Sequence, residues 1–390
     1  MIGLYNDNFP PVLDGVALTV QNYAYWLTKK GQDVSVITPY APKSKEVIKA
    51  AEYPIYRYSS VPIPFRHPYR YGLPYISLAF WLKWRKLNFD LVHAHCPFTS
   101  GDLALRAARE QQIPLVATFH SKYRQDFEHN VPNKKVVDWM VKTIIRFFES
   151  ADEVWIPQAA VEPTLREYGY KGNVTVVENG NDFCSPIDVI EAMRQEMRAE
   201  LGLLPEETML LFVGQHIWEK NIGFILEALE RIKDKPFQFF MVGTGYAVHD
   251  IRVKIKQLGL SHKVTLLGNI HDRERLKRID AAADLFLFPS LYDNAPLVVR
   301  EAAAMHTPAL MLAESTAAEV IKPDINGFLT PNDVQAYADR ISYLLEHHDV
   351  LSSVGNNASN TIARSWENVM DEVILRYHDI QQSYKLKHGK

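Results

Sequence analysis

Short apolar runs recur along the chain, and each is followed by a longer stretch with the apolar spacing of a helix. This alternation is typical of parallel β-sheets covered by helices, because parallel strands are joined by crossover connections. The predicted strands of the first half are residues 2–5, 34–38, 91–95, 115–119, 154–157 and 174–177. After a turn-rich segment at 179–182, the pattern restarts with residues 209–213, 237–242, 264–267, 285–288 and 309–312. The sequence therefore predicts an α/β fold with two separate parallel sheets.

The two sheets predict two Rossmann-like domains, since a chain of 390 residues is too long to fold around one ordinary hydrophobic core. We place the boundary so that the domains span residues 1–182 and 183–365. The final stretch, 366–390, has the apolar spacing of an amphipathic helix and is expected to pack back on the first domain. Open parallel sheets bind ligands beyond the carboxyl ends of their strands, so we expect these ends to face each other across a central cleft.

Composition argues against several classes of protein. The formal net charge of −3 gives no reason to expect a nucleic acid as partner. No run of about 18 uncharged apolar residues occurs, so no transmembrane helix is expected. The chain opens on a strand-like sequence without the basic flank and long apolar core of a signal peptide, which predicts a cytoplasmic location. Cys96 and Cys184 lie far apart in sequence, as expected for a protein of a reducing compartment.

One cluster of metal-binding residue types stands at a predicted strand end. His93 and His95 would share one face of a strand, with Cys96 directly after them. These residues could hold a metal ion, or they could be strand-end histidines near the cleft. Because no second cluster of matching ligands occurs, we favour the second interpretation and predict no metal cofactor.

The stretch from residue 56 to residue 86 is unusual because it mixes basic and aromatic side chains. Such a mixture suits contact with an anionic membrane, where rings lie at headgroup depth and cations meet anionic lipid. The alternative is a Pro-rich loop followed by a helix that buries Phe80 and Trp84. Both interpretations stay open. The residues concerned are Arg57, Arg66, Arg70, Lys83, Arg85 and Lys86, with Tyr58, Phe65, Tyr69, Tyr71, Tyr75, Phe80, Trp81 and Trp84.

Candidate site residues stand where predicted strands end. Gly15 precedes a helix whose first amides could bind an anion, and His120 could bond a sugar hydroxyl as a neutral imidazole. Gly214 and Gln215 follow a buried strand, and Lys220, at the start of the next helix, could present its ammonium to a diphosphate. Taken singly, each has an ordinary structural explanation as a turn glycine, a capping histidine or a solvated lysine. Two further strand ends are suited to enclose a nucleobase, namely Gly243 and Gly245 with Gly268, Asn269 and Ile270.

The most informative group lies between residues 290 and 305. Asp293 and Glu301 stand at the two ends of an apolar stretch that follows the predicted strand 285–288. A helix is expected to begin near Leu297, where the first amides can face a phosphate. An isolated acidic pair would more often face solvent. This pair is not isolated, because it follows the other groups in chain order and shares its loop with Asn294 and Pro296.

Taken together, these segments resemble the retaining glycosyltransferases of family four, which have the GT-B fold. The resemblance covers nearly the whole chain and is carried by the set of motifs rather than by any single one. The motifs are Phe9-Pro10-Pro11 through Gly15, Phe89 to Phe98, Ala117-Thr118-Phe119-His120-Ser121, Asn179-Gly180, Val213-Gly214, Glu219-Lys220-Asn221, Asp293 to Glu301 and Asn326-Gly327-Phe328-Leu329.

The resemblance implies that residues 183–365 bind a nucleotide diphosphate sugar, the donor, and that residues 1–182 bind the acceptor. The diphosphate of the donor would contact the Gly15 amide, the Lys220 ammonium and the amides of Leu297 and Val298. The same resemblance assigns Gly214, Gln215, Gly243, Asn269, Ile270, Asn294 and Pro296 to the donor site.

The resemblance also assigns residues to the sugar and the ribose. His120 would reach the transferred sugar near its sixth-carbon hydroxyl. Asp293 would hold sugar hydroxyls, and Glu301 would hold the ribose. The expected catalytic residues are therefore His120, Lys220 and Asp293.

Three positions depart from the family pattern. The family usually has Glu where Asp293 stands, and the shorter side chain can alter the choice of sugar. It usually has Arg where Gln215 stands, so neutralisation of the diphosphate depends more on Lys220 and on helix amides. The pair Asp14-Gly15 replaces a usual Gly-Gly pair, a variant that we associate with members acting on lipid or polyol acceptors.

A reaction that retains the anomeric configuration needs no close pair of catalytic carboxylates, because the leaving diphosphate can accept the acceptor's proton. The chain has no Asp-x-Asp metal clamp, so we expect activity without a metal or other cofactor. We expect transfer of a hexose, with glucose from UDP-glucose as the first choice, to a membrane lipid such as diacylglycerol. The alternatives are a soluble saccharide acceptor, a phosphorylase or sugar-nucleotide epimerase, and a non-catalytic sugar-nucleotide binding protein.

Overall fold

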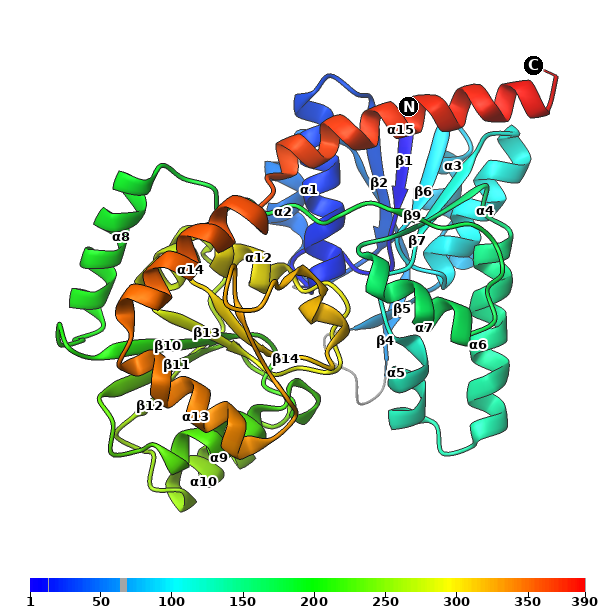
Figure 1. Ribbon diagram of the computed structural model, residues 1–390. Coiled ribbons are helices and arrows are strands. Elements are labelled where there is room, and N and C mark those ends of the chain that lie inside the picture. The colour runs from blue at the N-terminus through cyan, green and yellow to red at the C-terminus, as the bar shows by residue number, and fades with distance from the viewer. Residues whose placement is uncertain (13, 64–68, 390) are drawn as a thin grey trace. The chain divides into compact units, whose positions relative to one another are not determined.

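The computed structural model describes residues 1–12, 14–63 and 69–389, and its chain divides into two compact units (Figure 1). Unit 1 comprises Met1–Asn179 with Trp366–Lys390, and unit 2 comprises Gly180–Ser365. The division falls inside the turn-rich segment, three residues before the boundary placed from sequence. Leu13, Phe65 and Arg66, which the sequence analysis included in candidate segments, lie outside the described residues.

Unit 1 is built on a seven-stranded, wholly parallel sheet in the order β3-β2-β1-β6-β7-β8-β9. The order reverses between β1 and β6, which makes the carboxyl ends of these two strands the expected place for a ligand. β1, β2, β6 and β7 are buried along their whole length, as the apolar runs predict. The strands are β1 (Ile2–Tyr5), β2 (Val34–Pro39), β3 (Ile55–Tyr58), β6 (Leu91–Ala94), β7 (Leu115–Thr118), β8 (Glu153–Ile156) and β9 (Thr175–Val176).

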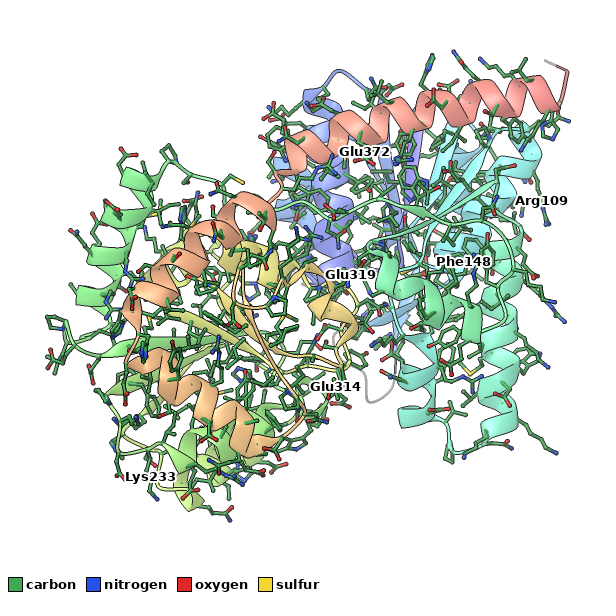
Figure 2. The ribbon with its side chains drawn as sticks, in the orientation of Figure 1. Arg109, Phe148, Lys233, Glu314, Glu319 and Glu372 are labelled. Carbon is green, nitrogen blue, oxygen red and sulfur yellow. The ribbon has the colours of Figure 1, made fainter. Side chains whose placement is uncertain are left out.

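Helices cover both faces of this sheet, and a small antiparallel pair, β4 (Ser60–Pro62) with β5 (Arg70–Gly72), extends from it. Phe148 of α6 is 1% exposed, and its ring meets that of Phe119 edge to face at 5.4 Å between centroids (Figure 2). The helices are α1 (Gly15–Lys29), α2 (Lys45–Ala50), α3 (Leu78–Trp84), α4 (Thr99–Gln111), α5 (Tyr123–Asn130), α6 (Lys134–Glu149), α7 (Glu162–Glu167) and α15 (Trp366–Lys387).

The C-terminal helix α15 lies along unit 1 beside α1 (Figure 1). Its apolar face buries Trp366, Val373 and Tyr377, the residues whose spacing predicted an amphipathic helix. Lys30 Nζ, just after α1, forms an ion pair with Asp371 Oδ1 at 2.7 Å. The end of the chain therefore belongs to the same core as its beginning.

Unit 2 has a six-stranded parallel sheet in the order β12-β11-β10-β13-β14-β15, which reverses between β10 and β13. Its strands are β10 (Thr208–Val213), β11 (Phe237–Val242), β12 (Val264–Gly268), β13 (Leu285–Phe288), β14 (Ala309–Leu312) and β15 (Phe328–Thr330). Its helices are α8 (Ile187–Glu200), α9 (Ile222–Arg231), α10 (Val248–Gln257), α11 (Arg273–Ala282), α12 (Leu297–Ala304), α13 (Val334–Leu345) and α14 (His348–Thr361). Both units thus have the strand order of a Rossmann fold.

The segment from residue 56 to residue 86 contains more structure than the sequence predicted. Residues of this stretch form most of β3, the β4–β5 pair, a 3₁₀ turn at Pro74–Ile76 and α3. Phe80 and Trp84 are buried, so the expectation of a helix that buries these two rings is confirmed. The opposite side of the same helix is exposed at Leu78 and Leu82. Across the described ranges, no helix combines the length and apolar character needed to cross a bilayer.

Candidate functional site

The loops after β10 and β13 meet in unit 2 through an ion pair. Lys220 Nζ lies 2.5 Å from Asp293 Oδ1, and the Ser290 hydroxyl donates to Asp293 Oδ2 at 2.6 Å. The two charged side chains are only 12% and 16% exposed. Because β10 and β13 are neighbours at the point where the strand order reverses, these two residues, 73 positions apart, come together. The structure therefore joins two of the residues predicted from sequence.

Local backbone geometry holds Lys220 in this position. Lys220 ends a 3₁₀ turn, Trp218–Lys220, and Asn221 follows in the left-handed conformation with φ 60°. Asn tolerates this conformation better than most residues. The Asn221 side-chain amide donates to the Pro289 carbonyl at 3.2 Å, which ties the two loops together. The sequence suggested that Lys220 starts the next helix, whereas Lys220 lies in the 3₁₀ turn two residues before α9 begins.

The glycines at the strand ends are required by close packing of neighbouring loops. Gly243 has φ 135°, and a Cβ there would collide with the Gly214 carbonyl oxygen. A Cβ at Gly245 would likewise collide with the His216 carbonyl. A third loop joins these two, since the Gly243 amide donates a hydrogen bond to the Gly268 carbonyl at 2.8 Å. Gly214 and Gly243 therefore bring three loop backbones close together beyond the sheet.

The remaining loop residues of unit 2 differ in exposure. Gln215 and Asn269 are exposed, and the Asn269 amide lies 3.0 Å from His271 Nε2. Ile270 packs against the core of unit 2. Asn294 is buried in the loop that carries Asp293. These four predicted site residues thus come from the loops after β10, β12 and β13, and only Gln215 and Asn269 among them are exposed.

Helix α12 begins at Leu297, as predicted, and Pro296 is its N-cap residue. Pro296 has no side-chain acceptor for the first amides, which include those of Leu297 and Val298. The positive end of the helix dipole lies at the same place. This helix end can therefore bind an anion next to the loop that carries Asp293.

Glu301 is the fifth of the eight residues of α12 and is buried, with 3% of its surface exposed. Burial raises the pKa of Glu301, and the positive charge of Arg273 opposes this shift. The Arg273 guanidinium donates to Glu301 Oε1 at 2.6 Å and to Asp182 Oδ1 at 2.5 Å. It also lies 4.4 Å from the ring centroid of Phe183. Sequence reasoning missed Arg273 and Asp182, since a single basic residue at a helix start has no distinctive pattern.

In unit 1, Asp14 is the N-cap of α1, and its Oδ1 accepts a hydrogen bond from the Ala17 amide at 2.7 Å. A negative group thus already occupies part of this helix end. Gly15 is exposed, and a Cβ there would meet no described atom within 4 Å. Packing therefore does not require glycine at this position.

His120 follows β7 and is half-buried. Burial lowers the pKa of His120 to about 3, so its imidazole is neutral near pH 7. His120 Nε2 lies 3.1 Å from His95 Nδ1, and the two rings stack. His93 lies in β6 and His95 directly follows this strand; their rings stack with centroids 4.0 Å apart, in agreement with the predicted shared face.

The structure gives His93 other partners than a metal. Its Nδ1 lies 2.6 Å from the Tyr377 hydroxyl, and its Nε2 lies 2.7 Å from the Thr118 hydroxyl. Within the part of the chain that the structure describes, no three His, Cys, Asp or Glu side chains are grouped so as to hold a metal ion.

Comparison with known families identifies both units. Residues 13–183 match the family described as Glycosyltransferase Family 4, and residues 193–361 match Glycosyl transferases group 1. The chain is a GT-B glycosyltransferase of these families. The loops around Lys220, Asp293 and Glu301 all lie in the part that matches the group 1 family.

Relatives of this glycosyltransferase include enzymes of lipid glycosylation. The alpha-monoglucosyldiacylglycerol synthase of Acholeplasma laidlawii is 25% identical over 92% of this chain and 91% of its own. The protein of the same name from Streptococcus pneumoniae is 27% identical over 79% of this chain and 70% of its own. The fold is also that of Anabaena HepE in complex with UDP and glucose, with a TM-score of 0.78, 19% identity and coverage of 96% and 98%.

A pH-dependence of stability follows from His216, which lies in the loop between Gly214 and Lys220. It is 1% exposed, and neither ring nitrogen has a hydrogen-bond partner among the described residues. Burial lowers the pKa of His216 to about 4, whereas an unfolded chain has a histidine pKa of about 6.5. As the pH falls from 7.5 to 5, the unfolded state gains a proton that the folded state does not bind.

We therefore expect the free energy of unfolding to fall more steeply on acidification in the wild type than in His216→Leu. The expected difference between the two proteins over this pH interval is about 2 kcal/mol. Urea denaturation of both proteins at pH 7.5 and pH 5 measures it. An identical pH dependence would show that His216 is protonated equally in both states.

Proposed function

We propose that this glycosyltransferase moves a glucose residue, with retention of configuration, from a nucleotide diphosphate sugar to a lipid hydroxyl such as that of diacylglycerol. The observation that carries the proposal is the pair formed by Lys220 and Asp293 where the strand order of unit 2 reverses. One cation for a diphosphate and one carboxylate for sugar hydroxyls lie within hydrogen-bond distance of each other.

A bound donor would replace the ion pair between Lys220 and Asp293 with contacts to its own diphosphate and sugar. Without a ligand, Lys220 and Asp293 neutralise each other in a partly buried loop. A bound diphosphate would offer Lys220 a second anion, supported by the amides at the start of α12. Asp293 could then accept hydrogen bonds from sugar hydroxyls. Glu301, one helix turn after the start of α12, would hold the ribose. Because Gln215 is uncharged, Lys220 would be the main cationic side chain in these loops for the diphosphate.

Charge stabilisation explains how such a site would work without a nucleophilic side chain. Negative charge develops on the diphosphate as the glycosidic bond breaks, and Lys220 with the α12 amides would stabilise it. The same diphosphate would accept the proton of the acceptor hydroxyl on the face where the bond is broken, which retains the configuration. The neutral imidazole of His120 would hydrogen-bond the transferred sugar. We propose that this chemistry requires no metal ion.

The names of relatives support glucose and diacylglycerol as the first choice. Two relatives, each about a quarter identical, are named alpha-monoglucosyldiacylglycerol synthase. The pair Asp14-Gly15 supports the same choice, because we associate this variant of the family's Gly-Gly pair with lipid or polyol acceptors.

Exposed apolar side chains around α3 in unit 1 support the choice of a membrane lipid as acceptor. Tyr75, Ile76, Leu78 and Leu82 are between 59% and 73% exposed around the start and middle of α3. Exposed cationic side chains stand beside these apolar ones, namely Lys83, Arg85 and Lys86. Apolar side chains next to cations suit peripheral binding to an anionic bilayer. We propose that this α3 surface docks on anionic membranes.

Replacement of Lys220 tests the donor site. Lys220→Ala should lower kcat/KM for the donor by about 100- to 1,000-fold, because it removes the charge that stabilises the leaving diphosphate. Donor transfer and thermal shift with a panel of UDP-, GDP- and ADP-sugars measure the effect. Lys233→Ala is the matched control, since Lys233 also pairs with a carboxylate, Glu230, but on the surface of unit 2 (Figure 2). Unchanged kinetics in Lys220→Ala would remove this residue from the site.

Vesicle binding tests the α3 surface. The double variant Leu78→Ser, Leu82→Ser should lose co-sedimentation with anionic vesicles while keeping its thermal stability, since both side chains are exposed. We expect a loss of about tenfold or more in affinity, as each buried leucine contributes on the order of 1–2 kcal/mol to membrane insertion. Equal binding of wild type and variant would show that another surface meets the lipid.

A further inference from the structure

Three histidines from two neighbouring strands of unit 1 form a stack. His93 and His95 come from β6 and the residue after it, and His120 follows β7. The rings of His93 and His95 lie 4.0 Å apart and those of His95 and His120 lie 5.3 Å apart, at interplanar angles of 30° and 18°. His95 is fully buried, whereas His120 is half-buried. His95 thus has no access to solvent and acts only on its neighbours.

One proton must lie between His95 Nδ1 and His120 Nε2, which are 3.1 Å apart. Burial lowers the pKa of both imidazoles, so each ring is neutral and carries a single N–H. The proton between them therefore belongs either to His95 or to His120.

The other nitrogen of His95 decides between these two arrangements. His95 Nε2 is buried and has no hydrogen-bond partner in the described ranges. If His120 were the donor, His95 would carry its proton on Nε2 as a buried, unsatisfied N–H. Orphaned N–H groups are rarer in native proteins than under-satisfied acceptors. If His95 is the donor, only an acceptor lone pair is left unsatisfied.

We propose that His95 is a positioning residue that donates its Nδ1–H to His120 Nε2 and so keeps the proton of His120 on Nδ1. His120 is then a hydrogen-bond donor through Nδ1, and its Nε2 is not available as a base. This inference rests on the proposed function for the role of His120 toward the sugar. It adds that the tautomer of His120 is set by a residue that does not touch substrate.

Neighbouring groups hold His95 in place. His93 stacks on one side of it and is fixed by Tyr377 and Thr118 through both of its ring nitrogens. Tyr23 packs edge to face on His95 with its ring centroid at 5.1 Å. Tyr377 belongs to α15, so the C-terminal helix contributes to the orientation of the stack.

Nuclear magnetic resonance of the free protein tests the tautomer without any substrate. In histidine-labelled wild type at pH 7, two-bond ¹H–¹⁵N correlations should show His120 protonated at Nδ1, with the signal assigned from His120→Gln. In His95→Leu, His120 should shift to the Nε2–H tautomer or to a mixture of both. In His95→Asn, the side-chain amide can replace the lost donor, and the Nδ1–H form should persist. A wild-type spectrum with Nε2–H, or an unchanged spectrum in His95→Leu, would overturn the proposal.

Kinetics then separate positioning from packing. His95→Leu should lower kcat by on the order of 10- to 100-fold with a smaller change in the KM for the donor, whereas His95→Asn should stay within about threefold of wild type. Equal losses in both variants would mean that His95 acts through packing alone. If the tautomer changes as expected but wild type transfers no sugar to any acceptor, the proposed function fails and the positioning role stands.

Discussion

The adjacency of β10 and β13 is the constraint on which the candidate site of unit 2 depends. In a doubly wound parallel sheet, the loops that follow the two central strands leave in opposite directions and create a place for a ligand between them. Here those loops carry Lys220 and Asp293, which meet at 2.5 Å, and Asn221 bonds across to Pro289. The glycines at the ends of β10 and β11 allow the neighbouring backbones to approach closely. The order of the strands thus brings residues that are distant in sequence into direct contact.

The candidate site residues of the two units differ in their charge. In unit 2, the partly buried or buried carboxylates of Asp293 and Glu301 are each held by a cation, Lys220 or Arg273. A diphosphate sugar that enters such a site has to exchange one set of charged partners for another, which favours a ligand with both anionic and hydroxyl groups. In unit 1, burial keeps His93, His95 and His120 neutral, so these three side chains offer hydrogen bonds rather than charge. In the proposed mechanism, Lys220 and the first amides of α12 in unit 2 would therefore stabilise the leaving diphosphate.

Sequence patterns predicted the strands that read as continuous apolar runs, both those buried throughout, such as β10, and the partly exposed β9 and β12. All eleven predicted strands are present, and α12 begins at Leu297 as expected. Among the described residues, the four missed strands are short or contain a charged residue: β4, β5 and β15 have three residues each, and β3 contains Arg57 and lies at the sheet edge. The contacts of Glu301 with Arg273 and of His95 with His120 were not predictable either, since spacing along one element does not reveal partners from another. The shared side of His93, in β6, and His95, directly after it, could be predicted, because that relation is local.

We propose above all that Lys220 and the first amides of α12 stabilise the leaving diphosphate without a metal ion or a nucleophilic carboxylate. The most direct measurement is transfer of glucose from UDP-glucose to diacylglycerol in anionic vesicles containing EDTA, with the anomeric configuration of the product read from its ¹H spectrum. We predict an α-linked product formed at the same rate with and without the chelator. A β-linked product, or transfer that appears only after manganese is added, would contradict this proposal.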